Sequence, residues 1–425
     1  MKTIRFLLAA LIFSTLQGQA QLNCSQKTAD IALMLKARNY SEAFRQWGEA
    51  EKCLAESEDL YAAGEKILEY KIDNAASADE KQLFLQRLLD LYTSYDKNFP
   101  TNTKSNVVKK AMLKHLNNIG KPDEIYVMLK NAFTNDRPNF TDAKALYVYF
   151  EMLFNKNKSG EKGISADDVY ALYSTIIAHL AELEKTSTSG KSNYKSATNG
   201  INALMSPMSS CDMLNPYYEK NYEAHKTEVS WLRDATTVLS FRNCTSGQLF
   251  LTIASQWYLL APDGASAYAL GVANMRNRNP VKATEYFNQA AELEKDLEEK
   301  AQICYTIATM LNNDKPESIK FLKKAIGYKP SFGKAYILMA QMYAGAGAEC
   351  AKTEFEKKAL YFLASQTAEK AATADIRLKG ASKQLSEMYL KSAPTSEEIS
   401  AEKMAGKKIT FGCWINESVT IPRKS

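Results

Sequence analysis

Apolar side chains recur every three or four residues along most of the chain, which is the spacing that places them on one face of an α-helix. Between residues 83 and 180 this spacing is carried by Leu83, Leu85, Leu88, Leu89 and Tyr92; by Val107, Val108, Met112, Leu113 and Leu116; by Tyr147, Phe150, Leu153 and Phe154; and by Val169, Leu172, Tyr173, Ile176, Ile177 and Leu180. Each group predicts an amphipathic helix. We therefore expect an all-α fold.

From Gly264 the helical pattern becomes a repeat. The stretch GASAYALGVANMRNRNPVKATEYFNQAAELEKD carries Leu270, Gly271, Ala283, Phe287 and Ala290. In residue type and spacing these five resemble the tetratricopeptide repeat, a helical hairpin of 34 residues. Small residues in this pattern let two antiparallel helices approach closely, and the aromatic residue fills the space beside them.

Similar units occur elsewhere in the chain. One starts at Ala301, one starts near Gly333, and the turn and second helix of another lie near the amino end, where Ala43, Trp47 and Ala50 hold the small, aromatic and small positions. The expected architecture is a superhelical solenoid of tetratricopeptide-type helix hairpins. Between residues 57 and 260 the consensus fades while the helical spacing persists.

These changes along the chain predict four segments: a signal peptide at 1–20, a degenerate helical array at 21–260, carboxy-terminal repeat units at 261–405, and an extended tail at 406–425. The stretch Thr186–Ser192 reads TSTSGKS and is the most linker-like. It is either a loop on one face of the array or a hinge between two halves. The tail is β-branched and aromatic without helical spacing, so we expect it to lie extended across the last helices as a cap.

The first twenty residues have the composition of a secretory signal peptide. Lys2 and Arg5 precede an apolar run from Phe6 to Leu16, and Gly18 and Ala20 are the small residues at the predicted cleavage site. We expect cleavage after Ala20 and a periplasmic protein, with association to the outer membrane as a further expectation. No other segment has 18 unbroken apolar residues, so we expect no membrane span after cleavage.

Composition supports the helical fold and limits the partners. The 425 residues include 18 Gly and 11 Pro, about 4% and 3%, below the average usage of about 7% and 5%. Lys and Arg number 54 against 48 acids. Loss of Lys2 and Arg5 with the signal peptide leaves 52 against 48, a net charge of +4. This mild charge on an exported chain does not indicate a nucleic-acid partner.

Seven cysteines in an exported protein are more typical of disulfides than of metal binding. No two of them form a C-x-x-C motif. Pairing in sequence order would join Cys24 to Cys53, Cys211 to Cys244 and Cys350 to Cys413. Six cysteines allow 15 connectivities, so the residues by themselves leave the pairing open.

Several local motifs make the chain resemble the exported tetratricopeptide-repeat proteins of Bacteroidetes-type Gram-negative envelopes. The most specific is Gly412-Cys413-Trp414-Ile415-Asn416-Glu417-Ser418, with Cys211-Asp212 and Glu349-Cys350 as further matches. The resemblance implies an all-helical periplasmic solenoid with the three pairings above. It implies no reaction. Cys304 falls at a buried position of its repeat, so we expect it to be a free thiol.

Candidate chemistry is sparse. No zinc-protease, nucleophile-elbow, P-loop or dinucleotide-binding motif is present, so we expect no enzyme, no cofactor and no metal. The pairs Asp167-Asp168 and Glu397-Glu398 could serve as acid and base, but at helix starts they more often cap the backbone and oppose the helix dipole.

The first helices of such repeats line a groove, and by resemblance some of their positions point into it. Here the predicted partner-binding residues are Tyr268, Val272, Met275, Arg276, Gln302, Tyr305, Thr309, Lys334 and Gln341. Their mixture of aromatic, amide and cationic groups suits an extended or helical peptide. The expected function is a non-catalytic scaffold that binds an envelope or outer-membrane protein, as a subunit of an outer-membrane assembly or secretion complex. Alternatives are a soluble glycan- or peptide-binding protein and, less favoured, a hydrolase of envelope polymer.

Overall fold

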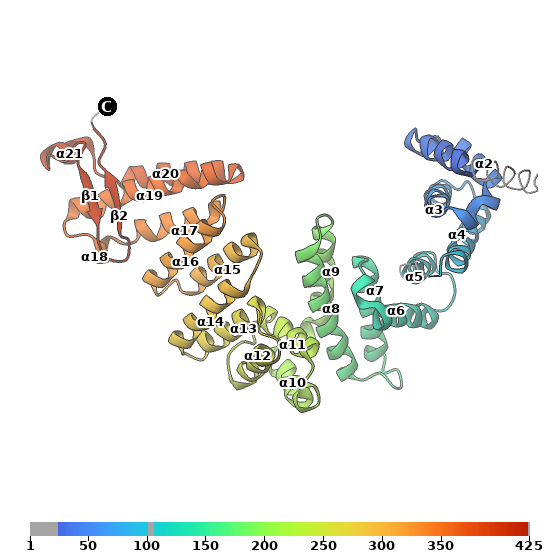
Figure 1. Ribbon diagram of the computed structural model, residues 1–425. Coiled ribbons are helices and arrows are strands. Elements are labelled where there is room, and N and C mark those ends of the chain that lie inside the picture. Colours follow the sequence, from blue (N-terminus) through green and yellow to red (C-terminus); the bar gives the residue numbers. More distant parts are fainter. Residues whose placement is uncertain (1–23, 101–105, 424–425) are drawn as a thin grey trace, which may run out of the picture. The chain divides into compact units, whose positions relative to one another are not determined.

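A computed structural model describes residues 24–100 and 106–423, and nearly all of them are helical (Figure 1). The predicted all-α fold of helix hairpins is confirmed. The predicted signal peptide and its cleavage after Ala20 lie outside the described residues. The chain divides into two compact units, residues 1–207 (unit 1) and 208–425 (unit 2). The boundary expected from the sequence lies after residue 260 instead. That boundary marks where the repeat consensus becomes clear, whereas the division at 207 reflects the contacts between helices.

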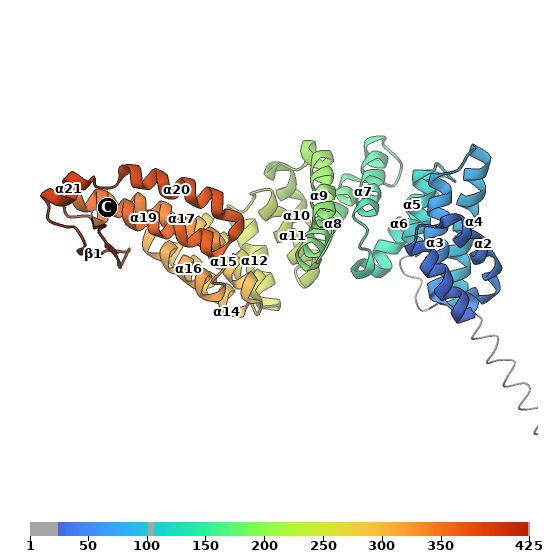
Figure 2. The same ribbon diagram turned by 90° about the horizontal axis from the view of Figure 1, so that it is seen from above.

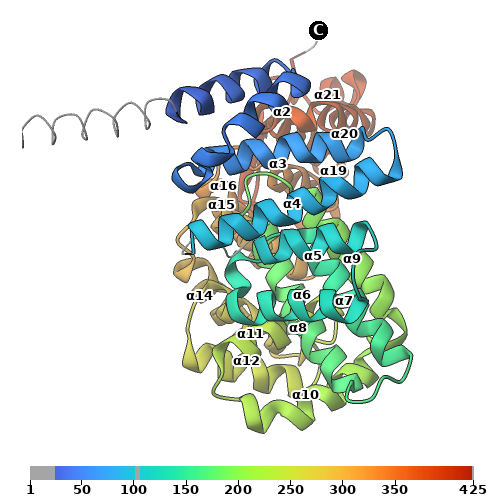
Figure 3. The same cartoon turned by 90° about the vertical axis from the view of Figure 1, so that its right-hand side faces the viewer.

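Unit 1 is a series of helices in which each packs against its neighbours in the chain (Figure 3). Its first described residues, 24–36, are helical. The other elements are α2 (Tyr40–Glu49), the 3₁₀ helix η1 (Glu51–Glu56), α3 (Glu58–Asp73), α4 (Ala78–Asn98), α5 (Asn106–Leu116), α6 (Pro122–Asp136), η2 (Arg137–Asn139), α7 (Ala143–Lys158), α8 (Ala166–Thr186), α9 (Lys191–Met205) and η3 (Ser206–Met208), the last of which runs one residue into unit 2.

Short polar residues start several of these helices by accepting backbone N–H bonds. Ser57 accepts from Leu60, Ser77 accepts from Glu80, and Ser165 forms a capping box with Asp168. The carboxylate of Asp168 therefore has a capping role. Helices α8 and α9 pack against each other, and residues 187–190 of the Thr186–Ser192 stretch join them as a loop within unit 1.

Unit 2 continues the same construction. Its helices are α10 (Cys211–His225), α11 (Val229–Phe241), α12 (Gln248–Leu260), α13 (Gly264–Arg276), α14 (Pro280–Leu293), α15 (Leu297–Met310), α16 (Lys315–Tyr328), α17 (Gly333–Ala344), α18 (Gly347–Cys350), α19 (Glu354–Ala374), η4 (Ile376–Leu378), α20 (Lys379–Ser392) and α21 (Ser396–Ala401). Figure 2 shows α17, α19 and α20 lying alongside one another near the carboxy end.

The core of each unit uses the consensus positions. Ala283, Phe287 and Ala290 are fully buried on α14, and the Phe287 ring occupies the space where a side chain on Gly271 would begin. At the amino end, the Trp47 ring lies against Gly64 of α3 and its indole donates to the Leu60 carbonyl at 3.0 Å. In both units, therefore, an aromatic ring on one helix packs against a glycine on the next or preceding helix.

The tail is extended, as expected, and its two short strands pair as a hairpin. Strands β1 (Lys408–Phe411) and β2 (Glu417–Thr420) are antiparallel, with Ile409 opposite Val419. A turn at 412–416 reverses the chain, with Cys413 and Asn416 at positive φ. The two strands pair their backbone groups with each other, and one face of the hairpin is buried. The apolar side chains of the tail that join the core are Ile409, Phe411, Ile415, Val419 and Ile421.

All three disulfides implied by the family resemblance are present. Cys24 joins Cys53 in unit 1, with their Cα atoms 5.6 Å apart. Cys211 joins Cys244, and Cys350 joins Cys413, both within unit 2. Cys304 is a buried free thiol, as expected. The first two bridges join residues 29 and 33 apart, about one repeat length, whereas the third spans 63 residues and ties the terminal hairpin to α18.

Candidate binding groove

The predicted partner-binding residues lie on α13, α15 and α17 of unit 2, and most of them are accessible. Five are exposed: Arg276, Gln302, Thr309, Lys334 and Gln341. Met275 is half-buried. Val272 is only 8% exposed, so its prediction as a groove residue is wrong. Its side chain is inside the unit because α13 is enclosed by helices on both sides, with α12 and α14 as its main neighbours.

The two predicted tyrosines hold neighbouring elements together. The Tyr268 hydroxyl donates to Met310 Sδ at 3.5 Å, and its ring packs on Phe287 with 5.8 Å between centroids. Burial raises the pKa of Tyr268. The Tyr305 ring packs on Phe332 with 5.4 Å between centroids. Part of each ring is therefore committed to packing within unit 2.

Four hollows of the described structure lie elsewhere. Three of them, here called hollows A, B and C, belong to unit 1, and none of the nine predicted residues lines any of these three. Hollow D in unit 2, of about 420 Å³, lies among α10, α12, α13 and α14 and also lacks the predicted residues.

Hollow A has a volume of about 980 Å³ and lies between the helical residues 24–36 and α3. Tyr40 is part of its wall, stacked on Tyr70 with 4.0 Å between ring centroids. Its charged lining side chains are of both signs: Lys36, Glu56, Asp59 and Lys66.

Hollow B, of about 280 Å³, lies among α3, α4 and α5. Hydrogen bonds hold several of its lining side chains in place. The Tyr95 hydroxyl donates to Glu58 at 2.8 Å, and the Tyr92 hydroxyl donates to Glu65 at 2.8 Å. Lys109 forms an ion pair with Glu65 at 2.7 Å. Burial, followed by the nearby charge of Glu65, raises the pKa of Tyr92. Tyr92 therefore stays a neutral donor, and the carboxylates have fixed positions.

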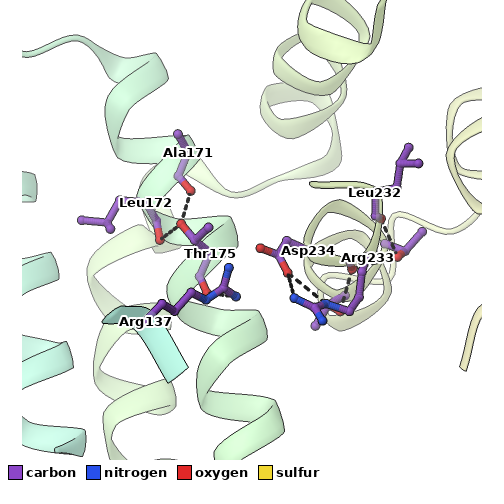
Figure 4. A network of polar contacts seen from close by, with 9 residues as sticks. Arg137, Ala171, Leu172, Thr175, Leu232, Arg233 and Asp234 are labelled. Carbon is purple, nitrogen blue, oxygen red and sulfur yellow. Dashed lines mark hydrogen bonds and ion pairs between the residues drawn. The ribbon is translucent and has the colours of Figure 1, made fainter. Parts of the chain in front are cut away.

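Hollow C, of about 860 Å³, lies among α5, α7, α9 and the segment 139–142. That segment is anchored from both sides. Arg137 donates to the Thr175 carbonyl of α8 at 2.8 Å (Figure 4), and the His179 ring lies 2.9 Å from the Phe140 carbonyl through Nε2. Asp142 then caps α7 by accepting from the backbone N–H groups of Lys144 and Ala145. The wall is thus held by contacts to α8 and α7.

A separate ion pair fixes a buried carboxylate in unit 2. Arg233 donates to Asp234 on α11 at 3.3 Å, and Asp234 is 2% exposed (Figure 4). Thr236 donates to the Leu232 carbonyl at 2.8 Å in the same helix. This cluster lines none of the four hollows.

Hollows A, B and C are neighbours that share lining residues. Asp59 and Ala62 of α3 line both A and B, and Lys109 of α5 lines both B and C. We call the three together the inner groove of unit 1. Its helical walls come mainly from residues 24–36, α3, α5, α7 and α9, which are the alternate helices of the array.

Sequence reasoning missed this groove because it lies where the repeat consensus fades. One usable signal was present. Gly200 sits inside a helical stretch, and in the structure the ring of Tyr147 occupies the space beside it, so a side chain at 200 would collide with a residue that lines hollow C.

No described helix combines the length and apolar character needed to cross a bilayer. Among residues 24–100 and 106–423, no group of three or more His, Cys, Asp or Glu side chains is placed to hold a metal ion.

Comparison with known proteins adds little to this picture. No family model matches the chain, and no curated protein matches it. Among solved structures, a monomeric mutant of IFIT1 with Gppp-AAAA is similar with a TM-score of 0.33 and 12% identity, over 86% of this chain and 89% of that chain. Both values are low, so the assignment of the fold rests on this chain's own helices and their packing.

Proposed function

We propose that this protein is a non-catalytic scaffold of the bacterial envelope, and that unit 1 binds an extended segment of a partner protein in hollows A and B of its inner groove. The observation that carries the proposal is that hollows A and B adjoin, with Asp59 and Ala62 lining both. Two adjoining hollows suit an elongated ligand better than one isolated hollow would.

The chemistry of hollows A and B supports a polypeptide of mixed charge. Lys36 and Lys66 line the groove together with Glu56, Glu58 and Asp59, so it presents both signs of charge. Tyrosine rings supply apolar surface with a polar tip, which is typical of protein interfaces. The expected segment carries both acidic and basic side chains around apolar anchors.

The cellular location forms part of the proposal. The signal-peptide pattern at 1–20 and the three disulfides of the described chain both fit an exported protein, because such bonds persist in oxidising compartments. We place the scaffold in the periplasm, where its partner would be an envelope or outer-membrane protein of an assembly or secretion complex.

Ala62 gives the sharpest test because its exposed side chain lines both hollow A and hollow B. A photo-crosslinking amino acid at position 62, expressed in the native cells, should capture one dominant envelope protein after irradiation. The same group at Gln82, which is exposed on α4 outside the hollows, is the matched control. Equal capture from both positions, or no capture at 62, would contradict the proposal.

A second pair of variants separates binding from folding. Ala62→Arg inserts a long side chain into the groove without loss of helix propensity, since Arg ranks close to Ala. It should abolish recovery of the partner captured at position 62 and leave the thermal unfolding unchanged. Gln82→Arg adds the same charge on the same unit and should bind normally.

A further inference from the structure

Hollow C differs from hollows A and B in the chemistry of its lining. Its volume of about 860 Å³ is within the range of roughly 300–1,000 Å³ typical of small-ligand sites. Small residues make up much of the wall: Ala143, Gly190, Ala197 and Gly200. These leave room for a ligand of several rings, larger than one amino-acid side chain.

One aromatic wall is held in place before any ligand arrives. The ring of Tyr147 lies so close to Gly200 that an added Cβ would be 2.8 Å from its Cε2 atom. Its hydroxyl donates to Glu151, one turn along α7, at 2.8 Å. Tyr194 of α9 is a second, half-buried ring that lines the same hollow. A flat ring fixed in this way is a surface on which a sugar ring can stack without ordering the side chain first.

The polar groups of hollow C are mainly neutral amides and hydroxyls. Asn193 and Ser196 are exposed on α9, and Asn139 and Thr141 are exposed on the opposite segment. The Asn139 amide nitrogen donates to Asp136 at 2.9 Å, which leaves the amide oxygen of Asn139 as its acceptor. Amides and hydroxyls can both donate and accept, as the hydroxyl groups of a saccharide also do.

The charged residues of hollow C largely have other roles. Asp142 caps α7, and Lys109 is paired with Glu65. Lys144 is exposed at the first turn of α7. A neutral polyhydroxylated ligand therefore matches the lining better than the mixed-charge segment that suits hollows A and B.

We infer that hollow C is a binding site for a neutral oligosaccharide, with its sugar rings stacked on Tyr147 and Tyr194 and its hydroxyls bonded to Asn193 and Ser196. This site is additional to the proposed protein-binding role and does not depend on it. The scaffold would then contact a glycan at one end of its inner groove and a protein segment at the other.

The test uses the full mature chain and a panel of neutral oligosaccharides of two to five sugars, namely gluco-, manno-, galacto-, xylo- and N-acetylglucosamine oligomers. Binding is measured by isothermal titration calorimetry and by saturation-transfer NMR. At least one member should bind. The double variant Asn193→Ala with Ser196→Ala should weaken that binding at least tenfold.

The variants are chosen so that unfolding cannot explain the loss. Asn193 and Ser196 are exposed, as are Ser192 and Lys195 of the same helix, which do not line hollow C. Ser192→Ala with Lys195→Ala should bind as the parent does, and so should Ala62→Arg, since position 62 belongs to hollows A and B. If no member of the panel binds, or if both double variants bind equally, the inference is wrong. Photo-crosslinking of a protein from position 193, without saccharide binding, would likewise overturn it.

Discussion

The indole of Trp414 donates to Glu349 Oε2 at 2.8 Å, directly beside the disulfide between Cys350 and Cys413. Two neighbouring residue pairs, 349–350 and 413–414, therefore fasten the terminal hairpin to α18 by one covalent bond and one hydrogen bond. Lys315 also bonds to Glu349. The bonds from Lys315 and then Trp414 lower the pKa of Glu349, so its carboxylate remains an acceptor under mildly acidic conditions.

Loss of this fastening should lower the stability of unit 2 in a graded way. Cys350→Ser with Cys413→Ser opens a loop of 63 residues, worth about 4 kcal/mol in the chain-entropy model. Trp414→Phe keeps the ring and removes only the donor, so its effect on Tm should be much smaller. Calorimetry of both variants checks the order. The expectation fails if Trp414→Phe costs as much as removal of the disulfide.

Glycines at ring contacts should resist replacement. Gly64 lies against the Trp47 ring, where an added Cβ would be 2.5 Å from Cζ2, and Gly271 lies against Phe287. Gly64→Ala and Gly271→Ala should therefore each destabilise by about 1–3 kcal/mol through overpacking. Gly327 of α16 has no atom within 4 Å of its added Cβ. Gly327→Ala should be neutral or stabilising by up to about 1 kcal/mol, since Ala favours helix. Chemical denaturation distinguishes the three, and equal effects would refute the packing argument.

Tyr268→Ala should lower stability, because it removes ring packing on Phe287 and a hydrogen bond to Met310. The expected cost is about 2 kcal/mol, in the usual range for loss of a largely buried side chain. Gln302→Ala changes an exposed residue on α15. Its free energy of unfolding should be within about 0.5 kcal/mol of the parent's. Thermal unfolding of both proteins measures the difference. A Tyr268→Ala variant as stable as the parent would contradict the packing role of this tyrosine.

Cys304 should be unreactive in the folded protein. Burial raises its pKa to about 11, so at pH 8 only about one thiol in a thousand is the reactive thiolate. Ellman's reagent should label the native, non-reduced protein very slowly and should detect one thiol per chain after unfolding. Fast native labelling, or a second thiol in the unfolded chain, would contradict this assignment.

The same thiol contributes a pH dependence of definite sign. An unfolded cysteine ionises from about pH 9, whereas the buried one retains its proton up to about pH 11. The folded state then holds more protons than the unfolded state, so stability falls as the pH rises through this window. Cys304→Ala should remove that part of the alkaline loss, which denaturation at pH 8 and pH 10.5 would show.

The sequence by itself determined the helical fold, the hairpin spacing and the buried consensus positions such as Ala283 and Phe287. These follow from local periodicity, because the spacing of apolar residues decides which face of a helix is buried. The disulfide pairing came from a family resemblance. Only the tertiary structure decided that Val272 is enclosed, that the tail folds into a hairpin and that three neighbouring hollows lie in unit 1. Each of these depends on contacts between segments distant in sequence, and Lys109 becomes part of two hollows only because α5 packs between neighbouring helices.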